Sequence, residues 1–249
     1  MDDHRNAAIQ HIGIVAGTAE GAALCYRTIC REAGKLLGPH VHPEVTMHTF
    51  PLHLYLDAIQ QDDWRTVAML MSQSAEKLAF AGADFIICPN NTLHQAFDLT
   101  NSPIPWLHIA DVAATESARR GFHRVGLLGT RIVMEGSLYP RRLGRLGIDY
   151  AIPDEHERAR LQDMILNELV AGEIRKESRS YVSVLVERLY KRGCDAVILA
   201  CTELPLLITS DESVVPLLDS TGLLAKAALT RAFAERDNPT AKTVLYGHA

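Results

Sequence analysis

An internal repeat is the feature of this 249-residue sequence that most restricts its fold. The segments GADFIICPNNTL (82–93) and GCDAVILACTEL (193–204) align without a gap, 111 residues apart. Each opens with glycine, carries an aspartate two residues later, runs through an apolar stretch and ends in small polar residues. A second pair, IGIVAGT (12–18) and VGLLGT (125–130), recurs at nearly the same spacing. Two repeated pairs at matching spacings indicate a duplicated structural unit.

The rest of the chain alternates short apolar runs with longer segments whose apolar residues recur at helical spacing. The strand candidates are residues 11–16, 45–50, 84–89, 106–110, 124–129, 149–152, 195–200 and 214–219. The clearest helical patterns cover 64–81, 111–120, 155–170 and 178–192. Short, nearly continuous apolar strands between helices are typical of parallel sheets covered on both faces. We therefore expect an α/β fold of two similar Rossmann-like lobes with parallel sheets, related by a pseudo-twofold axis.

The repeat also predicts where the lobes divide. The first lobe is expected to comprise residues 1–107 together with a C-terminal helical segment, about 218–249, that packs back onto it. The second lobe is expected to comprise residues 108–217, with the join near Pro103–Asp111. A chain of this length is large enough for two such units, since domains typically contain about 100–150 residues.

Composition excludes several classes of protein. The formal net charge of −5 leaves no basic surface for nucleic acid or an anionic membrane. No apolar run approaches the roughly 20 residues that span a bilayer, and the N-terminus MDDHRNAAIQ lacks the apolar core of a signal peptide. The five cysteines have neither metal-ligand spacing nor disulfide-framework density, which favours a reducing cytoplasm. The sequence contains no GxGxxG, Walker, HExxH or CxxC pattern, so we expect no nucleotide, no metal and no cofactor.

The repeated segments predict the position of the active site. Ligands of parallel sheets bind beyond the carboxyl ends of the strands. Each repeated strand ends there in small polar residues. These are Gly17 and Thr18; Asn90, Asn91 and Thr92; Gly129 and Thr130; and Cys201, Thr202 and Glu203. If the lobes face each other, the four loops converge on an interlobe cleft, with Asn90 and Cys201 on opposite sides of a bound ligand.

Such an arrangement suits inversion at a carbon next to a carboxylate, which needs a base on one face and an acid on the other. A cysteine can serve as either, because its pKa is readily shifted by helix N-termini and nearby donors. A helix is expected to begin near Glu203, which would tune the Cys201 thiol. The hydroxyl and backbone N–H groups of Thr92, Thr130 and Thr202 could hold the substrate carboxylate.

At these residues the sequence resembles the aspartate/glutamate racemase family, which uses two cysteines and no pyridoxal phosphate. The resemblance covers nearly the whole chain and is carried by LLGTRIVME (127–135) and CTELPLLI (201–208), supported by HIAD (108–111), IPDEHER (152–158) and ESR (177–179). It implies that Cys201 is the second catalytic cysteine. It further implies a substrate-binding shell formed by Gly17, Thr18, Asn91, Thr92, Thr130, Thr202 and Glu203. It also implies a cytoplasmic homodimer whose substrate is a small molecule, an amino acid or a dicarboxylate.

The sequence departs from the family pattern at three places. Asn90 stands where the family has its first catalytic cysteine, and asparagine does not exchange protons near neutral pH; Cys88 is an alternative thiol nearby. The family's substrate-binding lysine corresponds to Arg175, with Lys176 as an alternative. The arginine that some members use for the distal carboxylate has no counterpart, and His53 is the nearest replacement.

Three functions fit a site with one cysteine. The first is an amino-acid racemase or epimerase of the aspartate/glutamate type, in which Cys201 acts alone or with a water molecule held by Asn90. The second is a one-cysteine decarboxylase or isomerase of a small dicarboxylate or arylmalonate, as in arylmalonate decarboxylases of the same superfamily. The third is a paralogue that binds an amino acid without turnover. Maleate isomerase uses two cysteines, so Asn90 counts against it.

Overall fold

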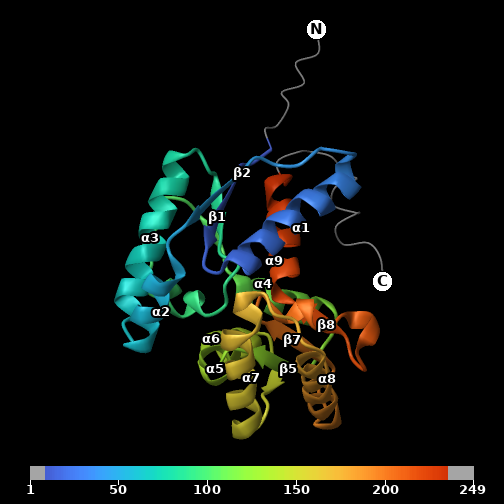
Figure 1. Ribbon diagram of the computed structural model, residues 1–249. Helices are drawn as coiled ribbons and strands as arrows, with labels where there is room; N and C mark the ends of the chain where they lie inside the picture. Colours follow the sequence, from blue (N-terminus) through green and yellow to red (C-terminus); the bar gives the residue numbers. More distant parts are fainter. Residues whose placement is uncertain (1–8, 235–249) are drawn as a thin grey trace.

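Two four-stranded parallel sheets form the framework of the protein (Figure 1). The computed structural model describes residues 9–234, and the ends of the chain, 1–8 and 235–249, lie outside the described residues. The first sheet has the strand order β2-β1-β3-β4 and the second has the equivalent order β6-β5-β7-β8. The equivalence pairs β1 with β5 and β3 with β7, which are the strands of the two sequence repeats. The predicted α/β fold with two similar lobes is confirmed.

The first part of the chain supplies one sheet and its helices. Its elements are β1 (Ile12–Ala16), α1 (Ala19–Leu37), β2 (Val45–Thr49), α2 (Leu52–Gln60), α3 (Trp64–Phe80), β3 (Phe85–Ile87), the 3-10 helix η1 (Leu93–Leu99) and β4 (Trp106–Leu107). Helix α1 begins directly after the first repeated strand because Thr18 caps it, its hydroxyl accepting the backbone N–H of Gly21 at 3.3 Å. The cap fixes the Thr18 side chain at the carboxyl end of β1.

The second part repeats this arrangement. Its elements are α4 (Ile109–Arg119), β5 (Arg124–Gly129), α5 (Arg131–Glu135), α6 (Leu138–Arg145), β6 (Asp149–Ala151), α7 (Glu155–Asn167), η2 (Leu169–Ala171), α8 (Lys176–Lys191), β7 (Ala196–Ala200), η3 (Leu204–Leu206), η4 (Ser210–Glu212), β8 (Leu217–Asp219) and α9 (Ser220–Ala232). The central strands β5 and β7 are almost wholly buried, as expected for a sheet with helices on both faces.

Three of the strand predictions are clearly too long. Of 84–89, only Phe85–Ile87 is a strand. Residues 106–110 were expected to be extended, but the strand ends at Leu107 and helix α4 starts at Ile109. The imidazole of His108 accepts the backbone N–H of Ala110 at 3.2 Å and so caps this helix. In 214–219 only Leu217–Asp219 is a strand, directly after Pro216, whose ring nitrogen carries no hydrogen for a sheet hydrogen bond.

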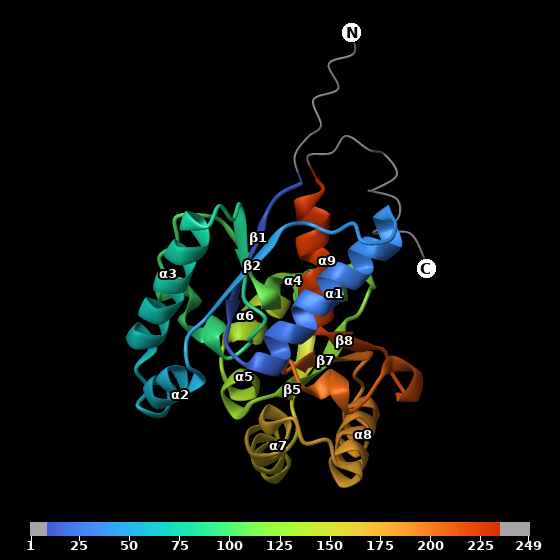
Figure 2. The same ribbon diagram turned by 45° about the horizontal axis from the view of Figure 1, so that its top comes forward.

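The last helix, α9, returns from the second sheet to the first. Its buried residues Leu224, Ala228 and Leu229 pack in one cluster with Ile12 of β1 and Phe85 of β3. Figures 1 and 2 show α9 beside α1 in both views. The proposed boundaries between the lobes stay a prediction, and the segments 1–8 and 235–249 assigned to the first lobe lie outside the described residues. None of the helices in residues 9–234 is long and apolar enough to cross a membrane.

Candidate active site

A cavity of about 460 Å³ lies where the carboxyl-end loops of the two sheets meet. This volume is within the range of about 300–1,000 Å³ typical of small-molecule sites. Four of the expected site residues enter it from the first half of the chain and four from the second. They are Thr18, Asn90, Asn91, Thr92, Thr130, Cys201, Thr202 and Glu203. The structure therefore brings together residues that are far apart in the sequence, as the repeat indicated.

The carboxylate of Glu203 is the polar centre of this cavity. It is buried, with 2% of its surface exposed, and accepts three hydrogen bonds. The Cys201 thiol donates to Oε2 at 3.1 Å, the Thr202 hydroxyl donates to Oε2 at 2.7 Å, and the Thr18 hydroxyl donates to Oε1 at 2.7 Å. All three donors are uncharged in this arrangement. The geometry links Cys201 directly to a carboxylate that can accept its proton.

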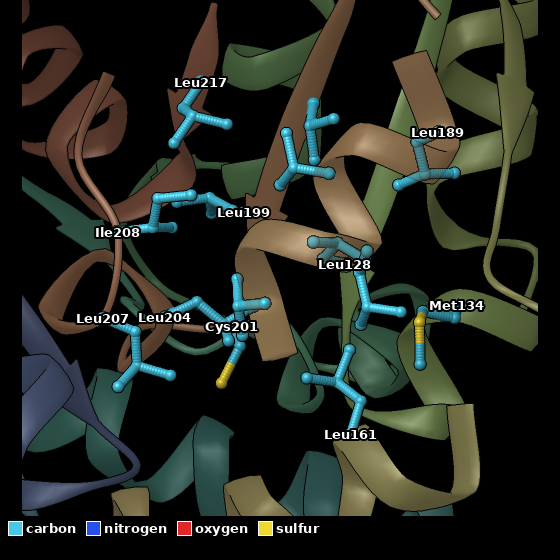
Figure 3. Packing of buried hydrophobic residues seen from close by; sticks show 14 of the residues in the cluster. Leu128, Met134, Leu161, Leu189, Leu199, Cys201, Leu204, Leu207, Ile208 and Leu217 are labelled. Atoms are coloured by element: carbon cyan, nitrogen blue, oxygen red, sulfur yellow. The ribbon is translucent and has the colours of Figure 1, made fainter. Parts of the chain in front are cut away.

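Cys201 lies at the boundary between the core of the second lobe and the cavity. Its side chain belongs to the buried cluster that includes Leu199 and Leu204, and it is 6% exposed. Figure 3 shows its sulfur directed away from Leu199 and Leu217, the residues at the strand end of this cluster. Because Cys201 also lines the cavity, its thiol can reach a bound molecule. Among the described residues that line the cavity, it is the sole thiol.

The pKa of Cys201 differs from the sequence-based expectation. A helix beginning near Glu203 was expected to tune the thiol, but only the three-residue 3-10 helix η3 follows. Burial raises the pKa of the Cys201 thiol well above its usual value, and the Glu203 charge raises this pKa further. The backbone N–H groups of Glu203 and Leu204 act in the opposite direction without reversing the shift. In the ligand-free protein Cys201 is therefore a thiol, prepared to donate a proton.

Asn90 enters the same cavity from the carboxyl end of β3. Its Oδ1 accepts the backbone N–H of Leu93 at 3.1 Å, which holds the side chain over the start of η1. A Cβ at Gly17 would lie only 2.5 Å from the Asn90 Nδ2, so the glycine leaves the space that this amide occupies. Gly17 thus acts on the site through Asn90 and is not among the residues that line the cavity.

His94 holds the backbone of Asn90. Its Nδ1–H donates to the Asn90 carbonyl oxygen at 2.8 Å, and its Nε2 accepts the backbone N–H of Ile109 at 3.4 Å. The ring is 1% exposed, and burial lowers the pKa of His94 to about 4. It is therefore neutral near pH 7, in the form that makes both hydrogen bonds. His94 therefore has a structural role, in which it fixes the loop carrying Asn90.

Asn91 and Thr92 connect the two halves of the site. The buried Tyr139 hydroxyl donates to Asn91 Oδ1 at 2.7 Å, and the Asn91 amide donates to the Ser220 hydroxyl at 3.0 Å. The Thr92 and Thr130 hydroxyl groups are 2.9 Å apart and hydrogen-bonded to each other. The Asn91 side chain thus fixes the loops across the cleft. Because Asn91 also lines the cavity, its expected contact with substrate stays a prediction.

Two predicted substrate-binding residues lie elsewhere. The Arg175 guanidinium is about half exposed and pairs with Glu168 at 3.3 Å and Glu173 at 2.5 Å. His53 lies on α2 with its side chain exposed. Neither is among the described residues that line the cavity. The alternative thiol Cys88 is fully buried in the core beside β3, and burial raises its pKa to about 12.

The sequence analysis missed the apolar part of the cavity. Helix α2 contributes Leu52, Leu56 and Ile59, while α7 and η2 contribute Ile165, Leu166 and Val170. These residues lie on amphipathic helices, where an apolar position usually indicates packing against the core. No signal in the sequence separates a leucine that lines a cavity from one that packs inside a lobe. Within residues 9–234 there is no group of three His, Cys, Asp or Glu side chains that could hold a metal ion.

Comparison with known proteins agrees with this fold. A family model described as Asp/Glu/Hydantoin racemase matches residues 14–228. The broad specificity amino-acid racemase RacX of Bacillus subtilis (strain 168) is 26% identical over 194 residues, which cover 76% of this chain and 82% of RacX. The crystal structure of a putative Asp/Glu racemase from Yersinia pestis has a TM-score of 0.82 and 32% identity, covering 90% of this chain and 99% of that one. An aspartate racemase homologue from Pyrococcus horikoshii OT3 has a TM-score of 0.77 and 26% identity, with the same coverage.

Proposed function

The chain belongs to the Asp/Glu/hydantoin racemase family, and on this premise we propose that it is a cofactor-independent enzyme acting at the α-carbon of an amino acid. Cys201 is proposed as the group that removes and returns the α-proton. One observation carries this proposal: the Cys201 thiol lines the interlobe cavity while it donates a hydrogen bond to the buried Glu203 carboxylate at 3.1 Å.

The proposed proton transfer uses both residues. In the resting site the proton is on the Cys201 sulfur and Glu203 is the acceptor. When Glu203 takes this proton, the resulting thiolate removes the substrate's α-proton and becomes a thiol again. The negative charge then spreads onto the substrate carboxylate. Hydroxyl and backbone N–H groups of the loops around Thr92, Thr130 and Thr202 are proposed to stabilise that charge.

Asn90 is proposed to occupy the place of the family's first cysteine, on the face of the substrate opposite Cys201. An amide does not act as an acid or a base near neutral pH, so this face needs a water molecule oriented by Asn90. With such a water the enzyme inverts the α-carbon. Without it the enzyme exchanges the α-proton of one enantiomer and leaves its configuration unchanged. Both outcomes use Cys201 in the same way.

A one-cysteine decarboxylase is the second candidate. It is favoured by the presence of one thiol among the described cavity-lining residues. In that reaction an arylmalonate or similar diacid loses CO2, and the Cys201 thiol protonates the carbanion that remains. The thiol form, which burial and Glu203 stabilise, is the form that this step requires. Release of CO2 without any exchange from amino acids would distinguish this reaction from racemisation.

The proposal is tested with separate L- and D-amino acids incubated in D2O with the purified protein and no added cofactor. Chiral chromatography follows inversion, and proton NMR follows exchange of the α-proton. We expect inversion or exchange from one enantiomer with the wild-type protein, and neither with Cys201→Ala. The matched control is Cys194→Ala, which removes a second buried thiol of the same lobe outside the cavity. Equal activity of the Cys201→Ala variant would contradict the role of this residue. We also propose that the protein is a cytoplasmic homodimer. Light scattering coupled to size-exclusion chromatography tests its oligomeric state.

A further inference from the structure

The cavity has an apolar side that the proposed proton transfer does not use. Beyond Cys201 and Glu203 it is walled by side chains from the two lobes. Helix α2 supplies Leu52, Leu56 and Ile59, and helix α7 with η2 supplies Ile165, Leu166 and Val170. A substrate whose carboxylate and α-carbon lie at the polar loops would extend its side chain between these helices. The wall therefore bears on the identity of that side chain.

The charged groups of the cavity also restrict which substrate side chains can bind. Among the described residues that line it there is no lysine, arginine or histidine, while Glu203 contributes a buried carboxylate. A second carboxylate on the substrate would be desolvated next to apolar side chains without a cation to pair with. The two groups that the family resemblance offered for this purpose are placed elsewhere: Arg175 pairs with Glu168 and Glu173, and His53 lies on the exposed side of α2.

None of the uncharged polar side chains of the wall supplies a positive charge, and two of them are already held by neighbours on the protein. The Gln162 Oε1 accepts the backbone N–H of Arg131 at 2.7 Å. The Asn167 amide donates to Asp163 at 2.5 Å. Both side chains are thus held by neighbours on the protein. They complete the edge of an apolar subsite and offer no positive charge to a distal carboxylate.

We propose that the substrate is an α-amino acid with a large apolar side chain, of the leucine, methionine or phenylalanine class, and not a dicarboxylic amino acid. The inference rests on the proposed function for the position of the α-carbon, and on the wall and its lack of cations for the side chain. Each methylene buried in such a subsite tightens binding by about fourfold. Leucine is therefore expected to bind tens of times more tightly than alanine, and aspartate more weakly than either.

Isothermal titration of the wild-type protein with both enantiomers of alanine, leucine, phenylalanine, aspartate and glutamate tests the substrate class independently of turnover. Parallel incubations in D2O record loss of the α-proton signal by NMR. The inference predicts binding and exchange in the order phenylalanine or leucine, then alanine, then aspartate. Exchange from aspartate or glutamate but not from the apolar amino acids would overturn the inference and leave the proposed function standing. Tight binding of leucine or phenylalanine without exchange of the α-proton would support the apolar subsite and contradict the proposed function.

Two variants and a control test whether the subsite lies between α2 and α7. Leu56→Arg and Leu166→Arg each put a cation into the wall, from α2 and α7 respectively, at positions that are not fully buried. We expect each to weaken leucine binding at least tenfold. Leu54→Arg is the matched control, because Leu54 is on α2 with an exposed side chain that does not line the cavity. Circular dichroism verifies that all three are folded. Unchanged leucine binding in both folded wall variants would overturn the inference, as would an absence of binding by every apolar amino acid.

Discussion

Replacing Asn90 by cysteine should supply the proton-exchanging group that is missing from one face of the proposed site. Asn90 lines the cavity from β3, in the loop equivalent to the one that carries Cys201 in the second lobe. Cysteine is smaller than asparagine, so it fits in the space that Gly17 leaves for the amide. With a thiol on each side of the α-carbon, one can donate a proton while the other removes one.

The size of the effect follows from two terms. A positioned acid or base typically contributes about 10²–10⁴-fold to the rate, and we expect the inversion rate to rise within this range. The substitution also removes the hydrogen bond from the Leu93 backbone N–H to Asn90 Oδ1, which is 3.1 Å long. Loss of one such hydrogen bond costs roughly 1 kcal/mol of stability. Asn90→Cys should therefore be more active in inversion and slightly less stable.

Chiral chromatography of product formed from each pure enantiomer gives the inversion rate, and urea denaturation gives the stability. Asn90→Ser is the matched control, because its hydroxyl can still accept the Leu93 N–H but does not titrate near neutral pH. Because it adds no group that titrates and removes the amide that orients water, its inversion rate should not exceed that of the wild type. If folded Asn90→Cys inverts no faster than Asn90→Ser, the assignment of position 90 to the face opposite Cys201 is refuted.

Three further predictions follow from contacts around the site. Glu203→Gln removes the charged acceptor of the Cys201 thiol, so kcat should fall about 10²–10⁴-fold with a much smaller change in KM. Steady-state kinetics would contradict the role of Glu203 in proton transfer if KM changed strongly and kcat did not. Tyr139→Phe removes the hydroxyl that donates to the buried Asn91 oxygen at 2.7 Å, so the free energy of unfolding should fall by about 1–3 kcal/mol. An unchanged midpoint of urea denaturation would argue against this link between the lobes. In the folded protein the pKa of His94 is lowered to about 4, so between about pH 6.5 and 4 the unfolded state binds more protons at this residue than the folded state does. The free energy of unfolding should therefore fall by up to about 3 kcal/mol as the pH drops through this range. Denaturation at a series of pH values in wild type and His94→Gln checks this, and the same slope in both proteins would exclude His94 as its source.

The central strands could be predicted from sequence because their apolar runs are short and bounded by clear turns. The expected segment 124–129 coincides with β5, and 195–200 differs from β7 by one residue. The strand at 106–110 was overextended because a buried helix start and a buried strand look alike over five residues. The decisive element there is the cap made by His108, a side chain hydrogen bond that hydropathy does not report.

The polar half of the site was also accessible to sequence analysis, since parallel sheets place their loops at one edge. The repeat alone indicates Asn90, Thr92, Thr130 and Cys201, and all four line the cavity. What the sequence could not supply is how side chains are oriented. Family position indicated Arg175 for the substrate, but neighbouring glutamates hold its guanidinium outside the cavity.

The helix start expected to lower the pKa of Cys201 is a further example of what depends on three-dimensional environment. The balance between desolvation and N–H donation depends on burial depth and on the Glu203 oxygen 3.1 Å away. The residue type and its place in the chain are compatible with either direction of shift. The sequence therefore predicts that a cysteine lies at the site, but its protonation state follows only from the atoms that surround the sulfur.

The most direct test of the account is the fate of the α-proton in D2O. Each enantiomer of phenylalanine, leucine and aspartate is incubated with wild type and with Cys201→Ala, and proton NMR follows the α-proton signal. The account predicts loss of that signal with the wild-type protein from at least one enantiomer, and a rate at least 10²-fold lower for folded Cys201→Ala. Exchange at the wild-type rate in the variant would contradict the claim that Cys201 moves the proton.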